Sequence, residues 1–193
     1  MQFYDQQIYD ALLDWGKLGC RTAANGAVLI GHVSHVAPEA WLHELYPPLS
    51  QSEISDAEVD CGVSFPESYR HFLLCTNGAK LFSGSIAIFG KRISYVRSGD
   101  DVWQPFSIVT PNRVERPREA MTYHLFVGSY KYDGSHICID TRDGRTFRSA
   151  RGTIQQMTEW ASFQAMLRGE VARLASHFDS TGRRIDADRP TTP

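Results

Sequence analysis

The residues best suited to covalent or metal chemistry are His71 and Cys75, four positions apart on a predicted helix. Side chains at this spacing share a helical face, so the pair could activate a thiolate or form half of a zinc site. Zinc needs a second pair, and the only nearby one, His32 and His35, is loosely spaced. A nucleophile would need an oxyanion donor and an orienting group, which we cannot locate in the sequence. We therefore favour a surface histidine beside a half-buried cysteine.

Three carboxylates that are close in sequence, Asp133, Asp140 and Asp143, could suggest a metal site or a general acid and base. Asp133 and Asp143 each precede a glycine, however, and Asp-Gly is typical of a tight hairpin turn. We therefore interpret both as turn residues. The sequence also lacks a glycine-rich phosphate loop, a G-x-S-x-G elbow and an H-E-x-x-H pair. We expect a protein that is not an enzyme and has no cofactor or metal.

A run of spaced arginines surrounds the second Asp-Gly turn: Arg142, Arg145, Arg148 and Arg151. Such a run could bind phosphate, nucleic acid or an acidic protein surface. The sequence pI is about 6.4, and no RNA-binding aromatic signature accompanies the run. We favour a solvated hairpin, with protein contact as the alternative, and expect no nucleic-acid partner.

Two loop regions combine aromatic and charged residues in the way that protein-binding hot spots do. The first contains Asp100, Asp101 and Trp103, and the second contains Tyr130 and Tyr132 on either side of a lysine. For Trp103 the alternative is a buried core position whose indole N–H is satisfied, and we favour that alternative.

The net charge of −2 conceals an asymmetry along the chain. Residues 1–60 carry nine acidic residues against Lys17 and Arg21, a net charge of −7, whereas the rest of the chain carries +5. The simple interpretation is that both sets of charges are solvated. The sharper one is a surface that steers a charged protein partner, with Glu53, Asp56 and Glu58 as candidate contacts.

Composition is that of an ordinary globular protein, with 42% hydrophobic and 22% charged residues. The N-terminus lacks the features of a signal peptide, and no apolar run approaches the ~20 residues of a membrane span. The four cysteines form no C-x-x-C pair, so we expect reduced thiols. These features predict a cytoplasmic protein without membrane contact, as a monomer or weak dimer.

The elements that must position these residues are clearest between Leu49 and Gly78. Ser50 and Glu53 have the spacing of a capping box, and Gly62 suits the left-handed position that ends a helix. Pro66 suits the first position of a second helix. Tyr69, Phe72 and Leu73 give that helix a buried stripe, and Asn77-Gly78 ends it.

The rest of the chain predicts an α+β fold with a mostly antiparallel, twisted sheet, helices packed N-terminally and a closing C-terminal helix. Residues 1–46 are expected to form a helical extension on the core, from the spacing of Tyr4, Ile8 and Leu12, with a short strand at 27–30 and a short helix from Pro38 through Leu45. Residues 47–178 form the main domain and 179–193 a disordered tail. Strands are expected at 86–89, 106–109, 123–127 and around the two Asp-Gly turns. The closing helix carries an apolar stripe: Trp160, Phe163, Leu167, Val171, Leu174 and Phe178.

A set of these positions resembles the opening of the SUKH superfamily domain: Ile54, Glu58, Gly62, Pro66, Tyr69, Arg70, Phe72, Leu73, Asn77 and Gly78. The strands around Phe126 to Gly128 and Ile137 to Asp140 resemble its central strands, so the resemblance covers roughly 46–169. The superfamily includes yeast cell-wall-synthesis regulators and many bacterial immunity proteins.

The resemblance implies a non-enzymatic binding protein. As an immunity protein it would neutralise a cognate toxin, typically a nuclease or deaminase, by covering the toxin's active site or substrate channel. The alternative is a scaffold or regulatory module, as the yeast relatives imply. Fold alone does not decide between these functions.

Overall fold

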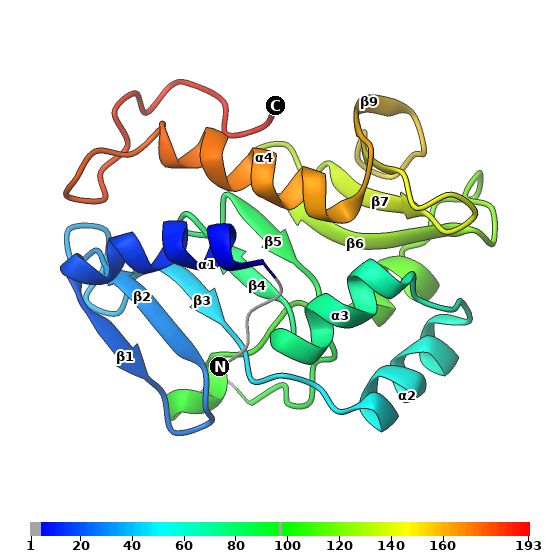
Figure 1. Ribbon diagram of the computed structural model, residues 1–193, viewed down its shortest axis with the longest axis horizontal. Coiled ribbons are helices and arrows are strands. Elements are labelled where there is room, and N and C mark those ends of the chain that lie inside the picture. The colour runs from blue at the N-terminus through cyan, green and yellow to red at the C-terminus, as the bar shows by residue number, and fades with distance from the viewer. Residues whose placement is uncertain (1–4, 97) are drawn as a thin grey trace.

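The computed structural model describes residues 5–96 and 98–193, and in them it shows the expected α+β fold. One antiparallel sheet contains nine strands, and their order in the sheet follows their order in the chain (Figure 1). The strands are β1 (Cys20–Thr22), β2 (Val28–His32), β3 (Trp41–Leu45), β4 (Ala79–Leu81), β5 (Ile86–Ile88), β6 (His124–Tyr130), β7 (His136–Asp140), β8 (Thr146–Ser149) and β9 (Gln156–Trp160). Every neighbouring pair is antiparallel, so the sheet is a meander.

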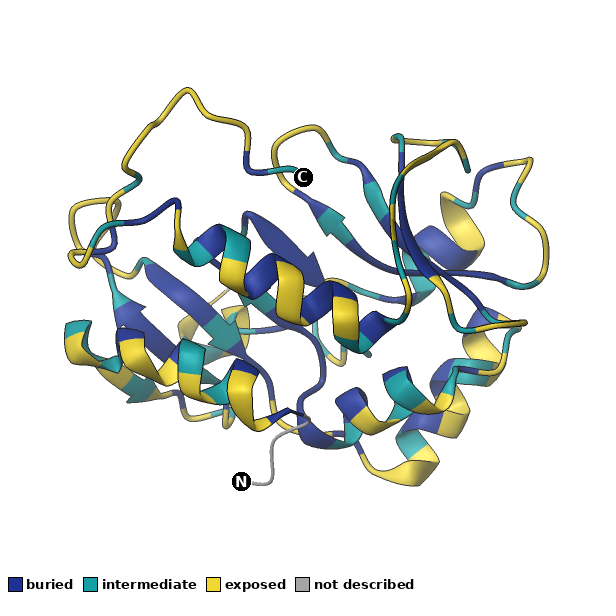
Figure 2. Cartoon of the chain, turned by 45° about the horizontal axis from the view of Figure 1, so that its top comes forward, coloured by how far each residue is buried: buried dark blue, intermediate teal, exposed yellow. Residues whose placement is uncertain are grey.

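The helices pack together on one face of this sheet (Figure 1). They are α1 (Gln6–Leu13), α2 (Gln51–Cys61), α3 (Glu67–Cys75) and α4 (Phe163–Ala175), with short turns η1 (Asp14–Leu18), η2 (Gly99–Val102) and η3 (Thr110–Val114). Buried and exposed residues alternate around α1 and α4 (Figure 2), as expected of helices with one face on a core. At the centre, the ring of Phe163 meets the rings of Tyr69 and Phe72 edge-on at 5.4 and 5.3 Å.

The start of α2 follows the sequence prediction closely. The Ser50 hydroxyl accepts a hydrogen bond from the Glu53 amide at 3.3 Å, and the Glu53 carboxylate accepts one from the Ser50 amide at 2.8 Å. Gly62 ends the helix with φ 69°. Pro66 is the residue just before α3 and not its first helical residue, because its ψ of 147° is extended.

We expect Ser50→Ala to lower the free energy of unfolding by about 1 kcal/mol, since it removes the side-chain partner of a helix-terminal amide. Urea denaturation followed by circular dichroism measures the change. Ser55→Ala is the control, because it removes an exposed hydroxyl of the same helix whose hydrogen bond goes to the Gln51 carbonyl and not to the cap. Equal losses in the two variants would contradict the assignment.

The expectation of a helix over residues 38–45 is wrong, because residues 41–45 form the strand β3. His43 and Leu45 face the helices while Glu44 faces away, and this two-residue period suits a strand paired with β2 and β4. The strand expected at 27–30 is present as β2. Tyr4 lies outside the described residues. The domain boundary at residue 46 stays a prediction, and the sheet runs across it.

Two other elements differ from expectation. Residues 106–109 form no strand: Ser107 makes one isolated bridge to Gly90, and the π-helical turn η3 follows. Trp160 ends β9, so the closing helix starts only at Phe163, after the cap Ser162.

The segment 179–193 was expected to be disordered, but it follows a defined path back along α4 (Figure 1). The carbonyl oxygens of Thr191 and Pro193 accept hydrogen bonds from Arg173 at 2.7 Å and Arg148 at 2.6 Å. Cationic donors on α4 and β8 therefore hold a polar segment whose composition alone predicts no core contact.

Candidate functional site

One row of side chains crosses the face of the sheet that the helices leave open. Ile86 and Ile88 point into the helix-covered core, so Ala87 between them points to the opposite face. The strand registers place directly opposed residues beside it on both sides. From β1 to β8 the row runs Arg21, Leu29, Glu44, Lys80, Ala87, Ser129, His136 and Ser149.

The row contains a depression, because its two central side chains, Ala87 and Ser129, are small. A hollow of about 680 Å³ lies above them. A second hollow of about 360 Å³ adjoins it and shares Phe106, Glu115, Ser129 and His136. We call the two together the sheet groove, defined by Glu44, Lys80, Ala87, Arg92, Tyr95, Phe106, Glu115, Ser129, Tyr132, Asp133, His136 and Arg151.

The described residues between β5 and β6, 89–96 and 98–123, form one side of the groove. Gly90 donates to the Phe106 carbonyl and accepts from the Ile108 amide, both at 2.9 Å. The ring of Phe106 then lies 5.2 Å from the Lys80 ammonium. Tyr95 and Phe106 remain 73% and 47% exposed. The groove therefore has an aromatic rim that no part of the described chain covers.

The charges in the groove are only partly neutralised. Lys80 pairs with Glu44 at 2.9 Å, and Asp133 pairs with the buried Arg148. Within the described residues, Arg151 and Glu115 take part in no ion pair. Such partly satisfied charges beside exposed aromatic rings are typical of a protein-binding surface.

His136 supplies a neutral polar group at the groove floor. Burial lowers the pKa of its imidazole, because the charged form loses hydration. Its Nδ1 is buried and has no hydrogen-bond partner among the described residues. Its ring meets Phe126 edge-on at 5.5 Å. The ring is thus fixed, and one of its nitrogens lacks a partner.

Of the loop aromatics predicted as contacts, Tyr132 lines the groove and is 56% exposed. Tyr130 is fully buried, so that prediction is wrong for its side chain. Tyr130 opposes Ile86 on the helix-covered face, whereas Tyr132 lies beyond the end of β6. Trp103 is half-buried against Ala23 and Tyr46, as favoured.

The predicted acidic contacts have mostly structural partners. The Glu58 carboxylate accepts hydrogen bonds from Arg70 at 2.5 Å and the Phe65 amide at 2.6 Å, and Glu53 forms the capping box. Asp56 is exposed, with a 3.1 Å ion pair to Lys91. Of the three predicted acids on α2, Asp56 is therefore the most available.

The other two predicted acids lie near β1, on the η2 turn. Asp100 accepts from the Ala24 amide at 2.6 Å and pairs with Arg21, and it thereby joins η2 to the β1–β2 hairpin. Asp101 is exposed. Neither residue lines the sheet groove, so the structure does not bring all the predicted contacts together.

The residues considered for catalysis have ordinary roles. Cys75 is buried and His71 is exposed, and burial raises the pKa of the Cys75 thiol, which disfavours a thiolate. Across residues 5–96 and 98–193, no group of three or more His, Cys, Asp or Glu side chains could hold a metal ion.

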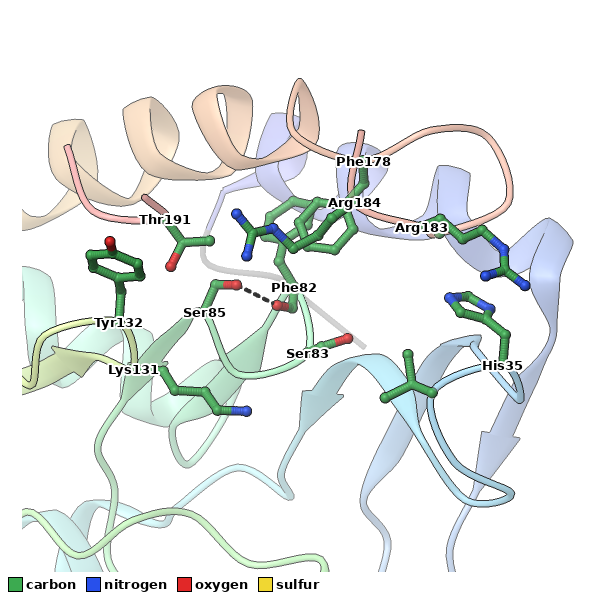
Figure 3. Close-up of a pocket in the computed structure, with 12 residues that line it drawn as sticks. His35, Phe82, Ser83, Ser85, Lys131, Tyr132, Phe178, Arg183, Arg184 and Thr191 are labelled. Atoms are coloured by element: carbon green, nitrogen blue, oxygen red, sulfur yellow. Dashed lines mark hydrogen bonds between the residues drawn. The ribbon is translucent and has the colours of Figure 1, made fainter. Parts of the chain in front are cut away.

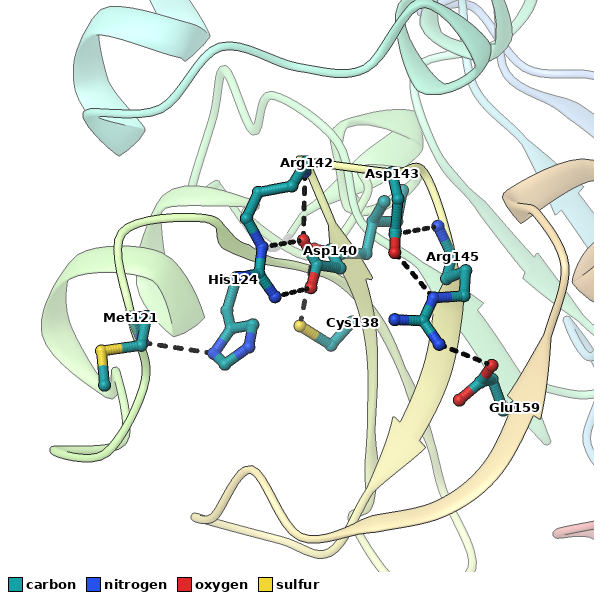
Figure 4. Close-up of polar contacts among 9 residues, drawn as sticks. Met121, His124, Cys138, Asp140, Arg142, Asp143, Arg145 and Glu159 are labelled. Carbon is teal, nitrogen blue, oxygen red and sulfur yellow. Dashed lines mark hydrogen bonds and ion pairs between the residues drawn. The ribbon is translucent and has the colours of Figure 1, made fainter.

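Three arginines of the run, Arg142, Arg145 and Arg148, pair with nearby carboxylates, whereas Arg151 has no such pair among the described residues. Asp140 accepts from Arg142 at 2.6 Å, and Arg145 bridges Asp143 at 2.7 Å and Glu159 at 3.3 Å (Figure 4). Asp133 and Asp143 each accept the amide two residues on, as in an Asx turn. The turn interpretation is confirmed for both residues.

These contacts predict that Asp140 makes a pH-dependent contribution to the free energy of unfolding. Hydrogen bonds from Arg142 lower the pKa of the Asp140 carboxyl. Because this pKa is lower in the folded protein than in the unfolded chain, where it is about 3.9, the Asp140 carboxylate stabilises the fold at pH values above about 3.9. This stabilisation is lost as the pH falls through the folded-state pKa. We expect Asp140→Asn to cost about 1 kcal/mol at pH 7, with the difference from wild type shrinking below about pH 4.

Denaturant unfolding at pH 7, 5 and 3 measures this dependence. Asp143→Asn is the control: its carboxylate also pairs with arginine, but it is exposed, so we expect a smaller change. A cost for Asp140→Asn that is the same at pH 7 and pH 3 would contradict the role of its charge.

Comparison with known sequences agrees with the resemblance seen in the sequence. The SMI1 / KNR4 family (SUKH-1) matches residues 48–180. The chain belongs to this family. This SUKH-1 match takes in α2 to α4 and β4 to β9, and therefore most of the groove floor, whereas Glu44 comes from the preceding strand. The SUKH-1 family includes toxin immunity proteins.

A short stretch of this SUKH-1 chain is also similar to the uncharacterized protein YnaB of Bacillus subtilis strain 168, with 51% identity over 37 residues. The stretch covers 19% of this chain and 26% of YnaB. No helix in the described part of the chain is long and apolar enough to cross a membrane.

Proposed function

We propose that this chain is a non-enzymatic immunity protein that binds a cognate toxin, of the nuclease or deaminase type, through the sheet groove and neutralises it by occlusion. Membership of the SUKH-1 family supports the class of function. The observation that carries the choice of surface is the open row across the sheet, with its small central residues and its exposed aromatic rim.

The groove suits a segment of another protein better than a small molecule. It is open along its length, and its rim presents tyrosine, phenylalanine and arginine, including Arg92 stacked 4.8 Å from the Tyr95 ring. These residue types dominate binding energy at protein interfaces. A toxin loop seated there would bury the rim and give His136 and Arg151 polar partners.

The test measures binding to a purified nuclease or deaminase encoded beside the gene. We expect the double variant Tyr95→Ala, Phe106→Ala to weaken binding by about 30-fold, since truncating two exposed anchors removes about 2 kcal/mol. Both side chains are exposed, so the fold should be retained. Val59→Ala, Ile185→Ala is the matched control, because both of its positions are exposed and lie outside the groove.

A second variant tests the floor. Ser129→Arg fills the hollow and should prevent binding, whereas Ser64→Arg, at an exposed position on the α2–α3 loop, should not. If the rim and floor variants bind as tightly as wild type, the groove assignment fails. If a cell-wall or signalling protein is the partner captured through the same residues, the scaffold alternative replaces immunity.

The acidic surface remains a separate prediction. Because Glu53 and Glu58 have structural partners, Asp56→Lys is the cleaner charge reversal. It should slow association with a basic toxin and reduce the salt dependence of the rate. An unchanged association rate would exclude Asp56 from steering.

A further inference from the structure

A third hollow, of about 590 Å³, lies at one end of the strands, under the C-terminal segment (Figure 3). Four segments form it: the β2–β3 loop, the β4–β5 turn, the β6–β7 hairpin and the residues that follow α4. We call it the tail pocket, defined by His35, Val36, Phe82, Ser83, Ser85, Lys131, Tyr132, Phe178, Gly182, Arg183, Arg184 and Thr191. Its volume is that of a small-molecule site.

The lining of the tail pocket is basic. It includes His35, Lys131, Arg183 and Arg184, and none of its residues is acidic. In the described part of the chain, the three Lys and Arg side chains take part in no ion pair. Asp179 lies nearby, but its Oδ1 already accepts from the amides of Thr181 and Arg183. Such a concentration of positive charge favours a bound anion.

Arg184 is held so that one of its donors lacks a partner. Its Nη2 donates to the Asp186 carbonyl at 3.0 Å and to the Arg189 carbonyl. Its Nε is buried and has no hydrogen-bond partner among the described residues. A buried N–H without a partner is costly, and an oxyanion in the pocket is the kind of acceptor that would remove that cost.

The β4–β5 turn beside the pocket is strained. Phe82 and Ser83 have φ of 53° and 55°, a conformation that residues other than glycine rarely adopt. The buried Phe82 ring, 4.7 Å from His43 and 5.5 Å from Phe178, holds the turn in place. Strain that the surroundings enforce is common at binding sites. Here it places the Ser83 hydroxyl at the pocket wall (Figure 3).

The remaining wall is apolar or aromatic. Val36 and Tyr132 are 61% and 56% exposed, and Phe178 closes the base. In Figure 3, Arg184, Thr191 and Tyr132 lie on one side of the hollow and Arg183 and His35 on the other. A ligand with both a multiply charged oxyanion and a ring would match these walls.

We propose that the tail pocket binds a small phosphate monoester that carries a ring, such as a mononucleotide. Lys131 and Arg184 would contact the phosphate, whose three terminal oxygens match several cationic donors. Arg183 lies across the hollow and would add to its positive field. Tyr132 would contact the ring. This goes beyond toxin binding, since His35, Arg183 and Arg184 do not line the sheet groove.

Calorimetric titration of the full chain with AMP, inorganic phosphate and adenosine tests the proposal. We expect AMP to bind most tightly, phosphate to compete with it, and adenosine to bind at least about tenfold more weakly than AMP. Lys131→Gln, Arg183→Gln should weaken AMP binding by at least about tenfold. Both positions are exposed, so thermal melting should be unchanged. Arg118→Gln, an exposed arginine outside every hollow described above, is the control and should bind AMP normally.

Four results would overturn the proposal. One is no detectable binding of AMP at about 1 mM, an affinity worth only about 4 kcal/mol. Another is equal binding of AMP and adenosine, because the phosphate would then contribute nothing. The third is an equal loss of binding in Arg118→Gln and in Arg183→Gln. Equal affinity for phosphate and AMP would overturn the assignment to a monoester and identify free phosphate as the ligand.

Discussion

Replacing Asn112 by leucine is expected to lower the free energy of unfolding by about 3 kcal/mol. The Asn112 amide, which is 1% exposed, makes three hydrogen bonds to the backbone. Its Nδ2 donates to the carbonyls of Ile108 and Phe126 at 2.8 Å each, and its Oδ1 accepts from the Phe126 amide at 2.9 Å. Leucine has a similar volume but no polar atom, so these buried backbone groups would lose their partners.

The loss should be visible both in stability and in the groove. Asn112 joins η3 to β6, and η3 follows directly on the part of the 89–123 segment that carries Phe106. We therefore expect faster proteolysis within this segment as well as a lower urea midpoint. Thr122→Leu, at an exposed position near the end of the same segment, should change stability by less than about 0.5 kcal/mol. If Asn112→Leu leaves the free energy of unfolding unchanged, other contacts hold the segment in place.

The helical parts of the fold were predictable because their signals are local. The Ser50 and Glu53 cap, the Gly62 stop and the stripe of Tyr69, Phe72 and Leu73 depend only on residues within a turn or two of one another. The Asp-Gly turns at Asp133 and Asp143 are local in the same sense. The same local residues carried the family resemblance, and the match over residues 48–180 confirms it.

The strand β3 was not predictable in this way. Proline at position 38 followed by an apolar stretch can start a helix, and pairing with β2 on one side and with residues 79–81, more than 30 positions away, on the other makes Trp41–Leu45 a strand. Residues 106–109 show the reverse: the strands on either side of this apolar run, β5 and β6, pair with each other, and the run makes only one isolated bridge. Pairing between distant strands decides both cases, and the periodicity of a few residues carries no information about which strands pair.

The candidate site was the least predictable part, for the same reason. Nothing in the sequence distinguishes Ala87 and Ser129 as a groove floor until the register of β5 and β6 sets them side by side. Tyr130 and Tyr132 have similar surroundings in the sequence, yet one is buried and the other is 56% exposed, because the strand ends between them. The alternation through Leu125 and Val127 was a usable signal for β6, but the Phe126 to Gly128 bulge shifts its phase before Tyr130.

Gly90→Ala is expected to cost about 3 kcal/mol, through steric overlap and not through backbone conformation. A Cβ at Gly90 would overlap the Asn77 carbonyl and its side-chain oxygen, with the carbonyl carbon at 2.7 Å. Asn77 cannot easily move away. It is 3% exposed, and its side chain donates to the Lys91 carbonyl at 2.8 Å and accepts from the Lys91 amide at 2.7 Å.

This contact gives the Asn-Gly pair at the end of α3 a role beyond ending the helix. Asn77 fixes the first residues of the segment that forms the groove rim, so Gly90→Ala should also weaken binding at the groove. Gly169→Ala is the matched control. Its nearest neighbour would be Trp160 Nε1 at 3.8 Å, and in the middle of α4 alanine should stabilise by about 0.8 kcal/mol. If Gly90→Ala lowers the free energy of unfolding by less than about 1 kcal/mol, Asn77 can move away from the added methyl group. Its hydrogen bonds to Lys91 then do not hold the segment in place.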